Sequence, residues 1–352
     1  MRNKRWSRRL LVPAVAVALA AVPSQAFAGG GTGAGGAPEG SASATGGAQN
    51  GGIQAQTKVT TTVNGGGAQS AKTGTLTPSN SNWTPPACWY EPSFSPKEIE
   101  ATVKAIRSLD GLPFFGGIGT AVGDMLDYRY KDGNPYKNYN LDQQGKGMFW
   151  AAVKNPNRKD DPAANACDKP PFWVPSGQPP NEPLAVSPKV LAEYAYDELP
   201  IPGTDVKMAP TGASTVNLPT WIWLDKTKIH KVSVTASLPG TGLSATTTAE
   251  PVSLHIDPGT SDAETIPASG DCMFLNGAIG EEYTAGKANQ TPPCGVRYLR
   301  STGAGGPYAL KATVTWRITW TSTTEPGVHS LPSGTFGDTQ NVTVREIQSV
   351  NR

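Results

Sequence analysis

The sequence is poor in the side chains that most often carry chemistry in enzymes. It has three histidines and four cysteines in 352 residues, and 16% of its residues are charged. No Gly-x-Ser-x-Gly elbow occurs, no cysteines are spaced as Cys-x-x-Cys, and no histidine stands at ligand spacing from a cysteine. These absences argue against a common serine hydrolase or a zinc site. We therefore assign no catalytic residue, no metal ligand and no cofactor.

A membrane-spanning run is also lacking near the start of the chain. The apolar stretch at 10–22 has 13 residues, which is too short to cross a bilayer. Five basic residues precede it, and Ala26-Phe27-Ala28 follows it. A basic segment, a short apolar core and a small-x-small site are typical of a secretory signal peptide. We expect cleavage after residue 28, a mature chain that starts at Gly29 and has no membrane span, and a secreted, extracellular or cell-wall-associated protein.

The export route has two interpretations. Ser7-Arg8-Arg9-Leu10-Leu11-Val12 resembles a twin-arginine signal, which would imply export after folding. The alternative is general secretion with folding outside the cell, and this suits a chain with four cysteines to pair. Both remain open at this point.

Positive charge is scarce once the signal peptide is removed. Five of the 30 lysines and arginines lie in residues 1–28, leaving 25 against 28 acids and a net charge of −3. The mature chain has no basic block of the kind that binds nucleic acid or anionic lipid. We therefore expect neither as a partner.

The four cysteines predict structural disulfides. They are Cys88, Cys167, Cys272 and Cys294, and they allow three connectivities. Sequential pairing, 88–167 and 272–294, is the simplest arrangement if the two parts of the chain fold separately.

Composition divides the mature chain into four segments. Residues 29–52 are almost wholly Gly, Ala, Ser and Thr, which predicts a disordered linker. Residues 53–80 alternate around Asn64-Gly-Gly-Gly and predict a small β-hairpin. Residues 81–215 predict a loop-rich mixed α+β region, and 216–352 a β-sandwich domain. The expected fold class is mainly β.

Two helix starts stand out in the mixed region. Ser95-Pro96-Lys97-Glu98 has Ser at the N-cap, Pro at N1 and Glu at N3, and Ser187-Pro188 repeats the first two features. The stretch between them, 128–183, is rich in Tyr, Asn, Gly and Pro. It predicts long loops held by Cys167 and by aromatic anchors, namely Phe149, Trp150, Phe172 and Trp173.

From Val216 the hydrophobic period becomes two. The clearest example is 310–320, where Trp316 and Trp320 share a face opposite Arg317. About seven such segments, separated by turn residues, favour an antiparallel sandwich. They are 218–224, 232–237, 243–248, 252–256, 296–299, 310–320 and 342–347.

Several of these segments together resemble a family of secreted actinobacterial proteins of unknown function. The resemblance rests on Thr220-Trp-Ile-Trp-Leu, on Cys272…Pro293-Cys294-Gly295…Tyr298, on Ala312 to Trp320 and on Pro85 to Pro92. It implies a PKD/Ig-like C-terminal sandwich and carries no activity. Relatives often have Gly-Asp-Gly-Thr after the central strand, where this chain has Asp257-Pro258-Gly259-Thr260.

Two groups of residues are candidates for binding. Planar rings stack on sugars and peptides, so the aromatic residues of the mixed region predict a recognition surface; they are Trp83, Trp89, Tyr90, Tyr128 and Tyr130. Oxygen ligands crowd a turn near Asp257 and Asp262, which makes a Ca²⁺ site one interpretation and a solvated loop the other.

Two classes of function follow. The first is an exported non-enzymatic protein, a structural module or one that binds a cell-envelope glycan or protein. The second is a secreted hydrolase acting on polysaccharide or peptidoglycan, with its site in 81–215.

Overall fold

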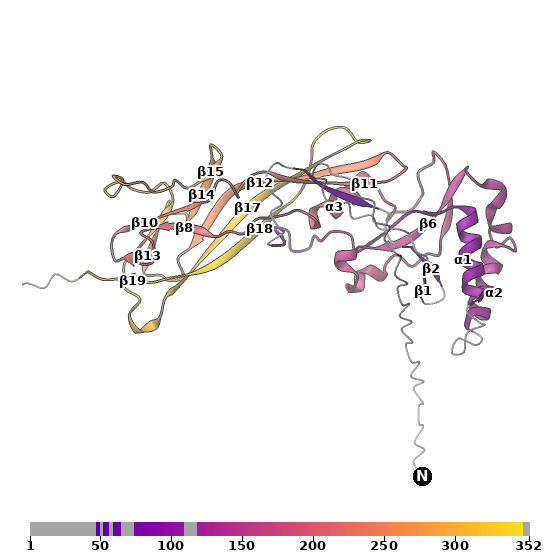
Figure 1. The fold of residues 1–352 in the computed structure, drawn as a ribbon, viewed down its shortest axis with the longest axis horizontal. Coiled ribbons are helices and arrows are strands. Elements are labelled where there is room, and N and C mark those ends of the chain that lie inside the picture. The colour runs from indigo at the N-terminus through magenta and orange to yellow at the C-terminus, as the bar shows by residue number, and fades with distance from the viewer. Residues whose placement is uncertain (1–46, 50–51, 56–58, 65–73, 109–117, 348–352) are drawn as a thin grey trace, which may run out of the picture. The chain divides into compact units, whose positions relative to one another are not determined.

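The computed structural model describes residues 47–49, 52–55, 59–64, 74–108 and 118–347 (Figure 1). The expected signal peptide and most of the expected linker lie outside these residues. The described part is mainly β, with largely antiparallel sheets and few helices, which confirms the predicted fold class. None of its helices is long and apolar enough to cross a membrane.

The mixed region is built on a three-stranded antiparallel sheet in the order β5-β6-β7. The strands are β5 (Cys88–Phe94), β6 (Gly147–Lys154) and β7 (Phe172–Pro175). One face carries Trp89, Phe149 and Ala151 into the main core, and the other packs Tyr90 against the Cys88–Cys167 disulfide. Short 3-10 turns connect these elements: η2 (Asn138–Gln143), η3 (Pro156–Arg158) and η4 (Pro162–Asn165).

Both predicted helices form. Helix α1 (Pro96–Ser108) starts with the expected capping box: the Glu98 N–H donates to Ser95 Oγ at 3.3 Å, and the Ser95 N–H donates to Glu98 Oε2 at 2.6 Å. Helix α3 (Pro188–Asp197) has Ser187 as its N-cap. A third helix, α2 (Ile118–Tyr130), was not predicted, and its C-terminal turn carries part of the candidate site.

The largest sheet is centred on two long strands, β12 (Leu243–Asp257) and β17 (Tyr308–Ser322). The order is β15-β14-β12-β17-β18-β4, with β11 pairing to β12 and β3 to β11. The register shifts near Pro251, which has no N–H to donate to the ladder. The other strands are β3 (Thr60–Asn64), β4 (Thr77–Pro78), β11 (Val232–Leu238), β14 (Asp271–Leu275), β15 (Ala278–Ile279) and β18 (His329–Val342).

A smaller antiparallel sheet has the order β13-β16-β10-β8. Its strands are β8 (Val206–Ala209), β10 (Pro219–Leu224), β13 (Ala263–Ile266) and β16 (Gly295–Tyr298). The Cys272–Cys294 disulfide joins β14 of the large sheet to the residue before β16. The remaining elements are the pair β1 (Gly47–Gln49) and β2 (Gly52–Gln54), the parallel pair β9 (Ser214–Thr215) and β19 (Val344–Arg345), and η5 (Gly303–Gly305).

The structure corrects the expected organisation in three places. The hairpin predicted over 53–80 is not seen, because β3 pairs with β11 and β4 pairs with β18. An isolated two-stranded hairpin is marginal in water, whereas a larger sheet offers these strands more buried area. The end of the predicted linker forms β1 and the first residue of β2, and the rest of β2 falls in the segment predicted as a hairpin. Finally, residues 329–341, for which no strand was predicted, belong to the 14-residue strand β18.

Strand β17 has the two faces that its sequence predicts. Trp316 is fully buried and Trp320 is 4% exposed, while the Arg317 side chain on the opposite face is 64% exposed. Strand β12 also alternates, and the segments predicted at 243–248 and 252–256 are parts of this one strand. The core of the large sheet therefore lies on its tryptophan face.

Candidate binding groove

The five aromatic residues expected to form a recognition surface lie mostly in the core. Trp89, Tyr90 and Tyr130 are at most 1% exposed, and Trp83 is half-buried. Tyr128 alone is well exposed, at 60%. The exposed surface expected from these residues is therefore not formed. Burial of such large rings supplies the core that a loop-rich region with few aliphatic residues needs.

The interior positions of these rings are fixed by polar and ring contacts. Trp89 Nε1 donates to Oε2 of Glu91, which is fully buried, at 2.8 Å. The Trp89 ring lies 5.4 Å from Tyr194 of α3, and Trp83 lies 4.9 Å from Tyr196. These contacts attach α3 to β5. They engage the rings of Trp83, Trp89, Tyr194 and Tyr196 in packing within the protein.

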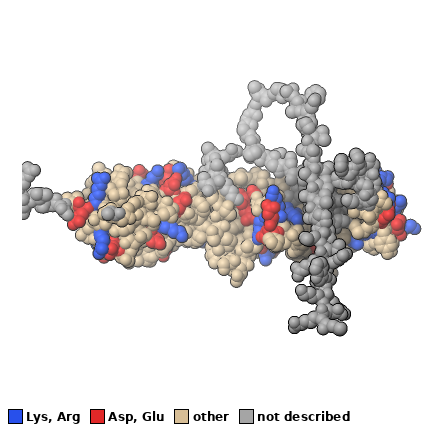
Figure 2. All heavy atoms as spheres, turned by 90° about the horizontal axis from the view of Figure 1, so that it is seen from below, with Lys and Arg blue, Asp and Glu red and all other residues tan. Residues whose placement is uncertain are grey.

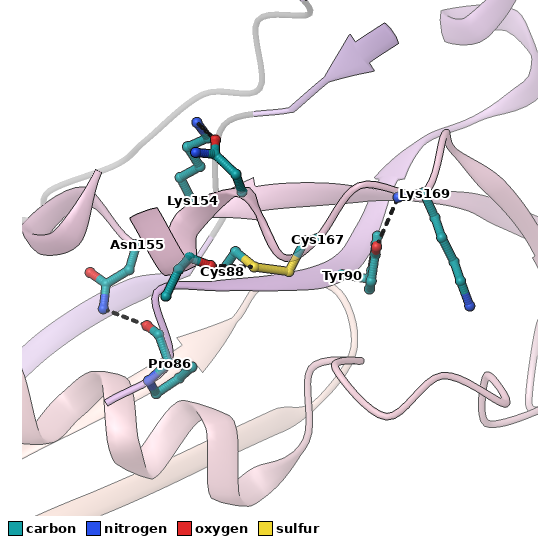
Figure 3. The surroundings of a disulfide bond; sticks show 9 residues. Pro86, Cys88, Tyr90, Lys154, Asn155, Cys167 and Lys169 are labelled. Carbon is teal, nitrogen blue, oxygen red and sulfur yellow. Dashed lines mark hydrogen bonds between the residues drawn. A yellow bond between two sulfur atoms is a disulfide. The ribbon is translucent and has the colours of Figure 1, made fainter. Parts of the chain in front are cut away.

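The Cys88–Cys167 disulfide holds a long connection against β5 (Figure 3). Two residues farther along, the Lys169 N–H donates to Tyr90 Oη at 3.0 Å, as the dashed line in Figure 3 shows. Burial raises the pKa of Tyr90, so the phenol stays neutral and accepts this bond. Together the two contacts fix the chain just before β7.

A groove of about 500 Å³ runs along β7. One wall is the segment from Lys169 to Pro175, and the other is a proline-rich turn after β7. That turn ends in backbone bonds to β5: the Tyr90 N–H donates to Leu184 O and the Val186 N–H to Tyr90 O. The polar or aromatic residues that line the groove are Arg129, Lys169, Phe172, Trp173, Gln178, Asn181 and Glu182.

Trp173 is, with Phe172, one of two aromatic residues that line this groove, and its neighbours hold it in place. Its ring centroid lies 5.2 Å from that of Phe149 at an interplanar angle of 67°. Gly147 on the neighbouring strand β6 leaves the space that the indole needs, because an added Cβ would lie 2.6 Å from Trp173 Cζ2. The half-buried indole is therefore a pre-positioned platform.

Two tyrosines bind the backbone just before β7 and within it, on the edge that no described strand covers. Tyr130 Oη donates to Pro171 O at 2.9 Å, and the Trp173 N–H donates to Tyr136 Oη at 3.0 Å. Because β7 is the last strand of its sheet, these bonds occupy positions that an added strand would use. Recognition in the groove therefore depends on side chains more than on the β7 backbone.

Arg129 reaches the groove from the last turn of α2. Its Cζ lies 5.6 Å from the centroid of the Tyr130 ring and 5.8 Å from that of Tyr136. These distances are in the range of cation–π contacts. No carboxylate among the described residues lies within salt-bridge distance of Arg129, and its Nε is shielded from solvent without a hydrogen-bond partner. The two rings hold the guanidinium in position, but no described carboxylate balances its positive charge.

Glu182 is the one acidic side chain among the residues that line the groove. It is 9% exposed and forms an ion pair with Lys169, which raises the lysine pKa, chiefly through the hydrogen bond to the carboxylate. The negative charge is therefore neutralised locally, and Arg129 leaves the lining with a net positive charge.

A second groove, of about 610 Å³, lies beside Trp223 of β10. Several of its charged side chains already have partners. Lys287 forms an ion pair with Glu281, and Asp225 accepts hydrogen bonds from the Thr227 hydroxyl at 2.7 Å and from the Thr227 N–H at 2.9 Å. These bonds from Thr227 lower the pKa of Asp225. A general acid needs a raised pKa, so Asp225 is not suited to that role.

A third groove, of about 580 Å³, lies on the solvated face of β12 and β17. Threonine hydroxyls line it, and Glu250 at one end pairs with Lys231 at 3.1 Å and with Arg317 at 2.5 Å. Trp320 is among its lining residues but is only 4% exposed, so its indole offers little surface for a ligand to pack on.

The turn proposed for calcium shows other contacts. Asp262 Oδ2 lies 3.1 Å from Arg300 Nε, and Asp257 Oδ1 accepts the Gly259 N–H at 3.0 Å. An arginine partner satisfies the charge that a cation would need. Within the described ranges, no group of three or more His, Cys, Asp or Glu side chains is placed to hold a metal.

Charges of both signs are mixed on the face of the molecule that Figure 2 shows. On the face shown in Figure 2, lysines and arginines lie among aspartates and glutamates, with uncharged stretches between them. No single-sign field gathers on the part of that face that is described.

Comparison with protein-family models, with curated proteins and with solved structures finds no match to this chain. The resemblance to secreted actinobacterial proteins with a PKD/Ig-like sandwich therefore stays a prediction. Function has to be argued from the groove itself.

The candidate groove lies in the mixed region where the sequence predicted a recognition surface, but Tyr128, Tyr130, Trp83, Trp89 and Tyr90 are not among its lining residues. Phe172 and Trp173 were expected as anchors of a loop, and they are residues of an edge strand that forms a groove wall. Arg129 lies between Tyr128 and Tyr130, which were predicted to bind a ligand, but Arg129 itself was not predicted to do so. A cation between two tyrosines was the signal available. Nothing in the sequence placed Gln178, Asn181 and Glu182 opposite it.

Proposed function

We propose that this protein is exported and works outside the cell as a non-enzymatic module that binds a cell-envelope glycan. The groove along β7 is the observation that supports this. It combines an indole platform, two amide side chains and a charged pair on a base fixed by a disulfide. Apolar walls with a few placed polar groups are typical of small-molecule and sugar sites.

The composition of the lining favours a sugar ligand. The faces of sugar rings are apolar and pack on an indole such as Trp173, while their hydroxyls bind amides such as Gln178 and Asn181. The phenols that bind the β7 edge favour recognition by side chains over the addition of a peptide strand.

Binding is supported better than hydrolysis. Glycosidases use two carboxyl groups about 5–9.5 Å apart. The groove lining has one, Glu182, which is paired with Lys169. The hydrolase alternative predicts that the protein releases new reducing ends from a polysaccharide. Such release by the purified protein would overturn the non-enzymatic assignment.

Export is part of the proposal. The signal pattern in residues 1–28 and the two disulfides agree, because disulfides persist in oxidising compartments. The expected result is a secreted form whose N-terminal residue is Gly29. Sequencing of the protein from the medium would contradict this if the chain still began at Met1.

The binding proposal is tested with purified exported protein and insoluble polysaccharide from the envelope of the producing cell. Trp173→Ala should weaken binding at least about tenfold, because loss of an anchoring aromatic residue typically costs about 2 kcal/mol or more. Thermal unfolding of the same sample separates a binding defect from a folding defect.

Trp223→Ala is the matched control, because it removes a half-buried indole from the second groove. It should leave binding unchanged. The groove assignment would be wrong if folded Trp173→Ala bound as well as the unchanged protein, or if both substitutions weakened binding equally.

A further inference from the structure

The unpaired guanidinium of Arg129 sets it apart from most arginines of the described chain. Five others pair with a carboxylate: Arg107, Arg158, Arg297, Arg300 and Arg317. Each uses at least one of its nitrogens in an ion pair, even where its Nε has no partner. Arg129 has no ion pair among the described residues, although its Nε is removed from solvent. A partly desolvated cation without an anion lowers stability unless a ligand supplies that anion.

The position of Arg129 is pre-organised. Its guanidinium contacts the rings of Tyr130 and Tyr136, which stack with an interplanar angle of 5°. Their hydroxyls are bound to the backbone at Pro171 and Trp173. The two tyrosines that hold the guanidinium are therefore already ordered before a ligand binds, and this lowers the entropy cost of binding.

The chemistry of the guanidinium selects the type of anion. Its planar fork matches the two oxygens of a carboxylate and forms parallel charge-assisted hydrogen bonds with them. Because Lys169 already neutralises Glu182, the lining carries one net positive charge. One carboxylate per bound unit would balance it.

Resting on the proposed function, we infer that the groove binds an acidic polysaccharide. The carboxylate of a uronic acid unit pairs with Arg129, and a neighbouring sugar ring packs on Trp173. An acidic peptide would offer the same carboxylate, but the β7 edge that would pair with its backbone is occupied by Tyr130 and Tyr136. The saccharide therefore fits the groove better than the peptide.

The test measures binding of the full exported chain to three uronate oligosaccharides: oligogalacturonate, oligomannuronate and hyaluronan fragments. Each is paired with its carboxyl-reduced counterpart, which has the same linkages and no charge. We expect at least one uronate to bind at least about tenfold more tightly than its reduced form, and the difference to shrink at high salt.

Arg129→Gln should abolish that difference, while Arg129→Lys should keep part of it, because lysine retains the charge and loses the fork. Arg317→Gln, in the third groove, is the matched control and should leave binding unchanged. Thermal unfolding establishes that each variant is folded. A folded Arg129→Gln protein that still discriminates the uronate from its reduced form would overturn the inference.

The outcomes also separate this inference from the proposed function. Equal binding of charged and reduced oligosaccharides, lost in Trp173→Ala, would overturn the acidic ligand and leave glycan binding standing. Tighter binding of poly-glutamate than of any uronate would overturn the saccharide assignment. Absence of binding to every oligosaccharide and to the envelope polysaccharide would overturn both.

Discussion

Trp316 and Trp320 illustrate what one side chain contributes to the large sheet. Both lie on the core face of β17, and Trp316 is fully buried. Truncation to alanine loses the transfer free energy of the ring and leaves a cavity. We expect Trp316→Ala or Trp320→Ala to lower the free energy of unfolding by about 3–5 kcal/mol. Denaturant melts measure this against the 5–15 kcal/mol typical of a domain.

Two substitutions serve as controls for that experiment. Trp316→Phe should cost less than Trp316→Ala, because Trp316 Nε1 has no hydrogen-bond partner in the described structure and phenylalanine fills much of the space. Arg317→Ala should cost about 0.5 kcal/mol, since its ion pair with Glu250 is largely exposed. An Arg317→Ala effect as large as that of Trp316→Ala would mean that both faces of β17 are buried.

The lowered pKa of Glu250 predicts that the stability of the folded protein depends slightly on pH. Hydrogen bonds from Arg317 and then from Lys231 lower its pKa below the ordinary value. A carboxyl whose pKa is lowered on folding stabilises the protein above its unfolded pKa, about 4.3, and this contribution is lost as the pH falls through the folded pKa. Glu250→Gln should therefore lower the melting temperature slightly at pH 7 and not in acid, where the wild-type carboxyl is protonated.

The size of this effect is limited by solvent. The Glu250 side chain is 30% exposed, so the contribution should stay below about 1 kcal/mol. Melting curves of both proteins between neutral and acid pH measure it. A constant difference at every pH would show that the substitution acts through packing rather than through charge.

At the scale of elements, local signals predicted local structure well. The N-cap serines of α1 and α3 could be predicted because each satisfies orphan N–H groups within its own turn. Strand β17 could be predicted because one of its faces is exposed to solvent, so that polar and apolar residues alternate along it. In contrast, β6 carries Met148 and Trp150 on its second face, so both faces are apolar and the alternation is hidden. Helix α2 has no acidic residue in its first turn.

The capping box of α1 makes an element-scale prediction. Ser95→Ala leaves the Glu98 N–H without its side-chain acceptor, and the loss should be about 1 kcal/mol of unfolding free energy. Ser95→Asp should recover most of it, because aspartate is an equally good cap. Denaturant melts compare the three proteins. If Ser95→Asp were as unstable as Ser95→Ala, the cap would not be the cause.

Long-range pairing is where sequence reasoning failed. The alternation at 60–64 is real, but its partner is β11, more than 160 residues away, and no local turn encodes that choice. The groove is a similar case. Arg129, Trp173 and Gln178 come from a helix, an edge strand and a turn, and they meet only because the Cys88–Cys167 disulfide and Tyr90 fix the chain between them.

For the whole molecule, the two disulfides should differ in function more than in stability. Loop-closure entropy predicts a loss of about 4 kcal/mol without Cys88–Cys167 and about 3 kcal/mol without Cys272–Cys294. The first supports the groove, and the second joins two sheets. Replacement of each pair by alanine should therefore weaken glycan binding only in the first variant. Equal loss of binding in both would show that the groove depends on global stability alone.

The two disulfides also determine how much chain can be drawn out by force. They close loops with separations of 79 and 22 residues. A residue adds about 3.5 Å when extended. The larger disulfide-closed loop therefore keeps roughly 270 Å of chain from being extended when the ends are pulled apart. Pulled from its ends in an oxidising medium, the protein would yield only the remaining chain. Reducing agent would release the stored length, and the covalent links thus act as a limit on extension.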